Sequence, residues 1–163
     1  MRKPNISVVY LDMDGVIADF EKRYKELFHM EPREAEKNNK FKPFFKEFIA
    51  NNNFATLEVM PGTDLGLKFL KNADVPVEIL SSTAKEEYYN DISKQKSLWL
   101  QKHGINYPAI FVPGKRFKKD YAGPDKILID DTKVNIDQWN EAGGIGIWHK
   151  DWPSTISILT MYI

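Results

Sequence analysis

Five short apolar runs rich in β-branched residues recur along the chain, and segments with helical spacing separate them. The first run, Ile6 to Leu11, shows no alternation of apolar and polar residues, which indicates a strand buried on both faces. Similar runs cover residues 75–80, 108–112, 126–129 and 145–148. Apolar residues between the runs recur at helical spacing, as in residues 20–28. Strands that alternate with helices predict an α/β fold with a doubly wound parallel sheet.

The size and composition of the chain fit one globular domain. It has 163 residues, of which 42% are hydrophobic and 28% charged, and its 23 Lys and Arg balance 23 Asp and Glu. Zero formal charge provides no global field for nucleic acid or anionic lipid, so a bound anion needs a local site. Zero cysteines exclude disulfides, thiolate zinc sites and iron–sulfur clusters. No apolar stretch approaches the roughly 18 residues of a membrane span, and we expect a cytoplasmic protein with no membrane attachment.

The stretch from Met30 to Glu58 interrupts the alternation of strands and helices. It is polar and rich in Asn and Lys, yet it carries five phenylalanines: Phe41, Phe44, Phe45, Phe48 and Phe54. We interpret it as a small helical cap inserted after the first strand and helix. The prediction divides the chain into an α/β core of residues 1–29 and 59–163 and a cap of residues 30–58.

Polar side chains follow the carboxyl ends of four of the predicted strands. They are Asp12 and Asp14 after the first strand, Ser81 and Ser82 after the second, the basic run 115–119 after the third, and Asp130 and Asp131 after the fourth. In an open α/β sheet these ends share one edge, where the ligand crevice forms. We therefore expect these side chains to converge on one site.

The residue types at this edge indicate phosphoryl transfer. Crowded carboxylates repel one another and need a cation between them. Oxygen ligands without a nearby His or Cys suit Mg²⁺, which prefers carboxylates, water and substrate phosphate. An Asp can attack phosphorus, while a metal ion and a lysine neutralise charge on the phosphoryl oxygens.

Four motifs in the same order resemble those of the haloacid dehalogenase (HAD) superfamily of phosphatases. They are VVYLDMDGV at residues 8–16, ILS at residues 79–81, the basic run 115–119, and ILIDD at residues 127–131. Within that superfamily, DMDGVIADFE at residues 12–21 is similar to the opening of the 5′(3′)-deoxyribonucleotidases. The resemblance covers nearly the whole chain and implies a Rossmann-like core with a cap.

The resemblance implies roles for the carboxylates. Asp12 would be the nucleophile that forms an aspartyl-phosphate. Asp14 would protonate the leaving alkoxide and then deprotonate the hydrolytic water. Mg²⁺ would be bound by the Asp12 carboxylate, the main-chain carbonyl of Asp14 and one acid of the fourth motif, with Asp131 the first choice and Asp130 the second.

The resemblance also implies the residues that bind phosphate. Ser81 and Ser82 would contact the phosphate after the second strand. In the third motif Lys118 is the first choice, because it stands three residues before Tyr121, as family members often show. Lys119 is the second choice.

The substrate pocket is expected to be aromatic. Phe20 stands at the position that faces the base in the deoxyribonucleotidases. Animal members carry a Phe-Trp pair in the cap, for which this chain offers Phe44 and Phe45, and they carry an Arg after the paired Asp, where this chain has Thr132.

These features predict a Mg²⁺-dependent phosphatase that hydrolyses ribo- or deoxyribonucleoside monophosphates, with deoxynucleotides preferred. Its expected partner is thus a small phosphate monoester rather than a polymeric nucleic acid, and a homodimer is compatible with the prediction. The alternatives are a phosphatase for another small phosphate ester or for a nucleic-acid 3′-phosphate, and an inactive scaffold of the same fold. A phosphoacceptor receiver domain would need a lone acceptor Asp after a middle strand, and residues 50–58 offer none.

Overall fold

The computed structural model describes residues 3–163, which form a five-stranded sheet flanked by helices. All four strand pairings are parallel, and the strand order is β3-β2-β1-β4-β5. The strands are β1 (Val8–Leu11), β2 (Val77–Ser82), β3 (Ala109–Val112), β4 (Lys126–Asp130) and β5 (Ile145–Trp148). The predicted doubly wound parallel sheet is confirmed.

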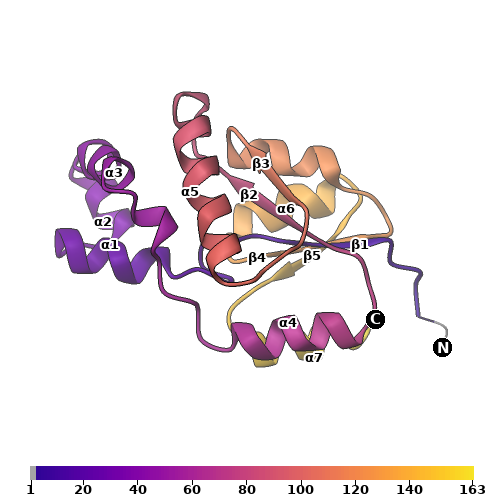
Figure 1. The fold of residues 1–163 in the computed structure, drawn as a ribbon. Coiled ribbons are helices and arrows are strands. Elements are labelled where there is room, and N and C mark those ends of the chain that lie inside the picture. Colours follow the sequence, from indigo (N-terminus) through magenta and orange to yellow (C-terminus); the bar gives the residue numbers. More distant parts are fainter. Residues whose placement is uncertain (1–2) are drawn as a thin grey trace.

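The helices divide between the two faces of the sheet and a separate group on one side of the molecule (Figure 1). The α-helices are α1 (Phe20–Phe28), α2 (Pro32–Lys37), α3 (Phe41–Ala50), α4 (Thr63–Asn72), α5 (Tyr89–Lys102), α6 (Lys133–Glu141) and α7 (Trp152–Leu159). The 3₁₀ helices are η1 (Asn53–Ala55), η2 (Glu86–Tyr88) and η3 (Lys115–Tyr121). Within residues 3–163, no helix is both long and apolar enough to cross a membrane.

Alternate residues of β1 face two separate apolar cores. Val9 and Leu11 belong to the core that includes buried side chains of α4, α5 and α7. Val8 and Tyr10 belong to the core on the other face, where Trp139 of α6 packs. Both faces of the strand are therefore covered, which explains why its sequence is apolar throughout.

Two strands extend further than the sequence predicts, and both extensions carry site residues. β2 continues through Ser81 and Ser82 because these residues pair with Phe111 and Val112 of β3. β4 continues to Asp130, which pairs with Trp148 of β5. The basic run expected as a loop is instead the 3₁₀ helix η3. Regular structure therefore fixes the backbone of these residues.

The elements α1, α2, α3 and η1, which we call the helical unit, gather on one side of the sheet (Figure 1). Aromatic side chains fill the space between them. They are Phe20, Tyr24, Phe28, Phe41, Phe44, Phe45, Phe48 and Phe54. Helix α1 packs with α3 through this cluster, although residues 20–28 were predicted to belong to the core.

Hydrogen bonds from α5 fix the helical unit to the core. The buried Gln95 amide donates to the carbonyl of Ile49 at 2.9 Å and accepts from the backbone N–H of Phe54 at 3.2 Å. The indole of Trp99 donates to the carbonyl of Leu57 at 2.8 Å. These contacts satisfy buried backbone groups of the helical unit, so its position beside the strand ends is specific.

Candidate active site

The turn after β1 brings the ends of β1 and β4 into close contact. The backbone N–H of Asp12 donates to the carbonyl of Ile129 at 3.0 Å. Gly15 adopts a φ of +81°, and a Cβ at this position would lie 1.9 Å from Oδ2 of Asp131. Only glycine permits both this backbone conformation and this approach. The absence of a side chain at Gly15 therefore allows Asp131 to face Asp12.

Lys118, on η3, bridges the acids of these two strands. Its ammonium donates to Oδ1 of Asp12 and to Oδ2 of Asp130, each at 2.8 Å, and only 2% of the residue is exposed. Asp130 also accepts from the backbone N–H of Thr132 at 2.8 Å and from the Asn135 amide at 3.0 Å. Asp130 is thus fully buried and occupied by protein donors.

Asp131 has fewer donors than its neighbour and faces the crevice. Its Oδ1 accepts from the Thr132 hydroxyl at 3.2 Å, and its main-chain carbonyl accepts from the Trp148 indole at 2.9 Å. Burial, followed by the negative charge of Asp130, raises the pKa of Asp131 to about 7. Oxygens of Asp12, Asp130 and Asp131 lie within 4.8 Å of one another.

A second buried lysine lies on the other side of the site. Lys96 of α5 is 1% exposed, and its ammonium donates to Oδ2 of Asp14 at 2.9 Å. The same ammonium donates to Oγ of Ser81 at 2.7 Å and to the carbonyl of Ser82 at 3.0 Å. Each of the two carboxylates after β1 therefore has its own buried ammonium.

The electrostatics of Asp12 reflect burial and competing neighbours. Burial raises the pKa of Asp12 well above its usual range, and the charge of Asp130 raises it further, while Lys118 lowers it. Burial lowers the pKa of Lys118, but the carboxylates of Asp12 and Asp130 outweigh that effect, so the pKa lies above its usual value. More positive charge beside Asp12 would favour its ionised form.

The donor set fits a divalent cation. The four carboxylates of the site and its two buried ammonium groups leave a formal charge of minus two, which is the charge that one Mg²⁺ neutralises. Two buried oxygens, Oδ1 of Asp14 and Oδ1 of Asn135, have no hydrogen-bond partner among residues 3–163. Unpartnered oxygens beside clustered carboxylates are suitable ligands for Mg²⁺ or for its bound water.

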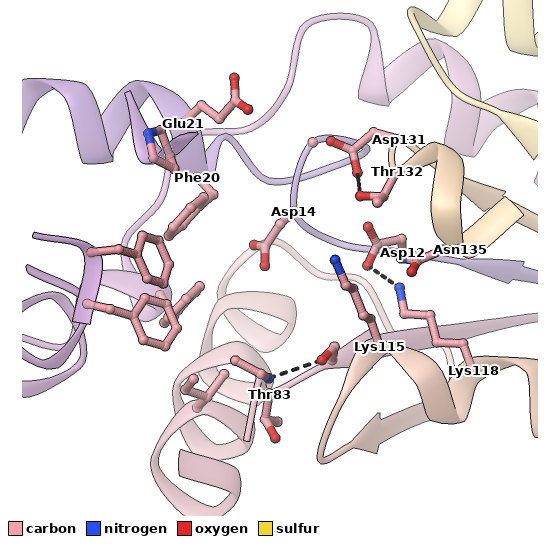
Figure 2. A pocket seen from close by; sticks show the side chains of 18 of the residues that line it. Asp12, Asp14, Phe20, Glu21, Thr83, Lys115, Lys118, Asp131, Thr132 and Asn135 are labelled. Carbon is pink, nitrogen blue, oxygen red and sulfur yellow. Dashed lines mark hydrogen bonds and ion pairs between the residues drawn. The ribbon is translucent and has the colours of Figure 1, made fainter. Parts of the chain in front are cut away.

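A cavity of about 430 Å³ joins the strand ends to the helical unit. In Figure 2, Asp14 lies between Phe20 on one side and the pair formed by Asp12 and Lys118 on the other. Lys115 extends toward the carboxylates from η3. The aromatic residues of the wall are Phe20, Phe41, Phe45 and Phe54.

The structure brings most of the predicted site residues to this cavity, and four do not line it: Ser81, Lys119, Phe44, and Asp130, which is fully buried against Lys118. Asp12, Asp14, Ser82, Lys118, Asp131, Phe20 and Phe45 line it. Ser81 is fully buried behind the wall against Lys96. Lys119 is exposed, and Phe44 stacks on Phe28 with ring centroids 4.4 Å apart, outside the cavity lining.

Lys96 was not predicted as a site residue, although the sequence carries a signal for it. Ile92, Lys96 and Trp99 recur at i, i+4 and i+7 on α5, which places the lysine on the apolar face of the helix. A charged residue at such a position is seldom fully buried without a partner. Asn135 and Phe54, which also line the cavity, were not predicted as site residues either.

Solved structures share this fold over nearly the whole chain. A hydrolase from Streptococcus pneumoniae TIGR4 is 12% identical with a TM-score of 0.55, and the match covers 96% of this chain and 100% of that chain. A HAD-superfamily hydrolase from Ehrlichia chaffeensis is 10% identical with a TM-score of 0.55 and 98% of each chain covered. The fold is therefore that of the HAD-superfamily hydrolases. No curated protein matches the sequence.

The family match is more specific than the fold. Residues 6–150 match the family described as 5′ nucleotidase, deoxy (pyrimidine), cytosolic type C protein. The matched range contains all five strands and the helical unit. The chain belongs to this family and is accordingly a phosphoric monoester hydrolase of the nucleotidase type.

Proposed function

We propose that the protein hydrolyses nucleoside monophosphates, with deoxynucleotides preferred, through an aspartyl-phosphate on Asp12. One observation carries the proposal: a single cavity joins the pair of Asp12 and Lys118 to a wall of phenylalanine rings. The charged end suits a phosphate and the aromatic end suits a base. The family match supports the same substrate class.

In the first half-reaction Asp12 attacks phosphorus. A bond forms between a carboxylate oxygen of Asp12 and phosphorus, while the bond from phosphorus to the 5′ or 3′ oxygen of the nucleoside breaks. Asp14 donates a proton to that leaving oxygen, so the nucleoside departs as an alcohol. Lys118, 2.8 Å from Oδ1 of Asp12, orients the attacking group.

In the second half-reaction water attacks the phosphorus of the aspartyl-phosphate. Asp14, now ionised, removes a proton from the water, and the bond between phosphorus and the Asp12 oxygen breaks. Inorganic phosphate leaves, and both carboxyl groups regain their starting protonation. One residue therefore serves as acid and then as base, which restores the enzyme after each turnover.

The phosphate contacts in this proposal are Ser82 and Lys118. Oγ of Ser82 accepts from the backbone N–H of Ala84 at 3.0 Å, which leaves its proton available for a phosphate oxygen. Ser81 acts indirectly, because its hydroxyl contacts Lys96 instead of the cavity. Lys115, which lines the same cavity, adds positive charge near the phosphate.

The residues that would hold Mg²⁺ are Asp12, Asp131 and the main-chain carbonyl of Asp14. When bound, Mg²⁺ supplies positive charge that favours the ionised Asp12 and neutralises phosphoryl oxygens. Asp131 is preferred to Asp130 because protein donors already occupy both oxygens of Asp130.

The helical unit is proposed as the cap that selects the substrate. The predicted cap of residues 30–58 is extended toward its N-terminus by α1, which shares the aromatic cluster. Its rings give an apolar aromatic wall for a base, and the limited cavity favours a small ester over a polymer. A cytoplasmic location and a homodimer remain part of the proposal.

The test is release of inorganic phosphate from deoxyribo- and ribonucleoside monophosphates, sugar phosphates and a 3′-phosphorylated oligonucleotide, with Mg²⁺ present. The Asp12→Asn variant is the blank, and a parallel series contains EDTA. Turnover of nucleotides that EDTA abolishes supports the proposal. Turnover of only the sugar phosphates or the oligonucleotide would contradict the proposed nucleotide substrate but would support the proposed phosphatase chemistry. No turnover of any compound would contradict the enzyme proposal and favour an inactive scaffold.

A further inference from the structure

Lys96 is a deeply buried charge that the proposed reaction leaves without a role. The residue is 1% exposed, and it reaches the strand ends from the middle of α5. Its ammonium lies 5.2 Å from the ring centroid of Phe54, which belongs to the helical unit. A buried ammonium is costly unless every one of its protons has an acceptor. The position of Lys96 therefore requires specific partners.

The hydrogen bonds of Lys96 account for all of its donors. An ammonium carries three protons, and the three acceptors within reach are Oγ of Ser81 at 2.7 Å, Oδ2 of Asp14 at 2.9 Å and the carbonyl of Ser82 at 3.0 Å. No proton is left for a phosphate oxygen. Lys96 therefore acts on the protein rather than on the substrate.

The contact with Asp14 makes its two carboxylate oxygens different. Oδ2 accepts from Lys96, whereas Oδ1 is buried and has no partner among residues 3–163. Asp14 itself lines the cavity between the aromatic wall and Asp12 (Figure 2). A carboxylate whose one oxygen is held by a hydrogen bond points its other oxygen in a defined direction.

We propose that Lys96 is a positioning residue that clamps Oδ2 of Asp14 and so directs Oδ1 toward the leaving oxygen of the substrate. Ser81 and the carbonyl of Ser82 anchor the ammonium at the end of β2. The inference rests on the proposed function, because it assigns the geometry of the acid in that reaction. It adds a residue from α5 to the charged groups that the strand ends and η3 supply to the site.

The leaving group of the substrate distinguishes positioning from a general structural effect. A nucleoside leaves as an alkoxide that needs a proton, whereas p-nitrophenolate leaves without one. Misplacing the acid should therefore slow the first half-reaction with the nucleotide and spare the first half-reaction with p-nitrophenyl phosphate, whereas the second half-reaction, in which Asp14 is the base, is the same for both substrates. A distorted site should slow the first half-reaction with both substrates.

The decisive experiment measures how fast Lys96→Met releases the leaving group in a single turnover, before the aspartyl-phosphate is hydrolysed, together with KM, on a deoxynucleoside monophosphate and on p-nitrophenyl phosphate. We expect this single-turnover rate to fall about 10²-fold on the nucleotide and to stay within about threefold on p-nitrophenyl phosphate, with KM little changed. Asp14→Asn should show the same pattern. Lys94→Met, which removes an exposed lysine from the same helix, should keep both rates.

An equal loss on both substrates, or no loss on either, would overturn the positioning role.

Denaturant unfolding of Lys96→Met, Asp14→Asn and the double variant tests the contact between Lys96 and Asp14 without relying on activity. We expect the double variant to lose less in midpoint than the two single losses together, since Lys96→Met leaves Asp14 without its ammonium and Asp14→Asn leaves the buried ammonium without its carboxylate. Additive losses would overturn the contact. If the native protein hydrolyses neither substrate, the proposed function fails, while the unfolding series still decides whether Lys96 holds Asp14.

Discussion

The wall of the cavity formed by the strand ends carries buried charges, whereas the wall formed by the helical unit carries aromatic rings. Asp130 is 0% exposed and Lys118 2%, and both have charged partners at 2.8 Å. On the opposite wall the rings of Phe20 and Phe54 stack with centroids 5.6 Å apart. The first wall depends on directional contacts between opposite charges, and the second on apolar area.

The two walls should therefore respond differently to substitution. Removing one buried charge leaves its partner unpaired in a poorly solvated place, which is costly and changes the chemistry. Removing one ring costs packing and contact area, but it creates no unpaired charge. The strand-end wall should thus control turnover, and the aromatic wall should control which substrate binds.

The largest expected effect comes from Asp12→Asn. An amide cannot act as the nucleophile, so turnover should fall by more than about 10³-fold. Phosphate release measures the loss, and circular dichroism checks that the fold is retained. Residual turnover close to that of the native protein would show that Asp12 is not the nucleophile.

A matched pair of lysines on η3 tests the charge network. Lys118→Met should destabilise the protein by about 3 kcal/mol and abolish turnover, because it leaves Asp12 and Asp130 facing each other without the shared ammonium. Lys119→Met removes an exposed lysine, and its free energy of unfolding should change by less than about 0.5 kcal/mol.

Urea unfolding of both variants provides the measurement. Similar losses from Lys118→Met and Lys119→Met would mean that the network contributes little to stability. The stability of the strand-end wall would then not depend on its buried charge pairs, as it is expected to do.

The pH dependence of stability tests another buried group behind the strand ends. Burial lowers the pKa of His149 to about 4, and its Nδ1 lies 2.7 Å from the Thr155 hydroxyl. His149 binds a proton near pH 6.5 in the unfolded chain, but only near pH 4 in the folded protein. Stability from this group is complete above pH 6.5 and is lost as the pH falls toward 4, by up to about 3 kcal/mol.

Urea unfolding at several pH values between 4 and 7 measures this effect in the native protein and in His149→Gln, which cannot titrate. The native protein should lose more stability than the variant across that range. Parallel pH profiles for the two proteins would show that His149 gains its proton equally in both states.

The smallest expected effect comes from the aromatic wall, where adjacent residues offer a matched pair. Phe45 lines the cavity, whereas Phe44 stacks on Phe28 away from it. Phe45→Ala should raise KM for a nucleotide about tenfold by removing contact with the base, and it should leave KM for a small sugar phosphate unchanged. Phe44→Ala should leave both KM values unchanged. Equal effects of the two variants on the nucleotide would mean that the wall does not bind the base.

Much of the fold could be predicted because its signals are local. The uniformly apolar run around Val9 indicates a strand covered on both faces, and the structure shows an apolar core on each face. The edge that gathers Asp12, Asp14 and Asp131 follows from parallel strands whose carboxyl ends share one side of the sheet.

The details of the site could not be predicted, because they depend on contacts between distant segments. Asp14 and Lys96 are 82 residues apart in the chain, and Asp12 and Lys118 are 106 apart. Helix periodicity places Lys96 on the apolar face of α5, but it does not say that this face meets Asp14. The same limit applies to α1, whose rings pack with the helical unit rather than with the sheet.

The sequence by itself determined the order of strands and helices, the edge of the sheet that bears the site, and the kinds of side chain found there. Only the tertiary structure decided how those side chains are paired: Lys118 with Asp12 and Asp130, and Lys96 with Asp14. The physical reason is that periodicity reports which side of an element is buried. The partner of a buried charge is instead decided by the few acceptors that packing brings within hydrogen-bond distance.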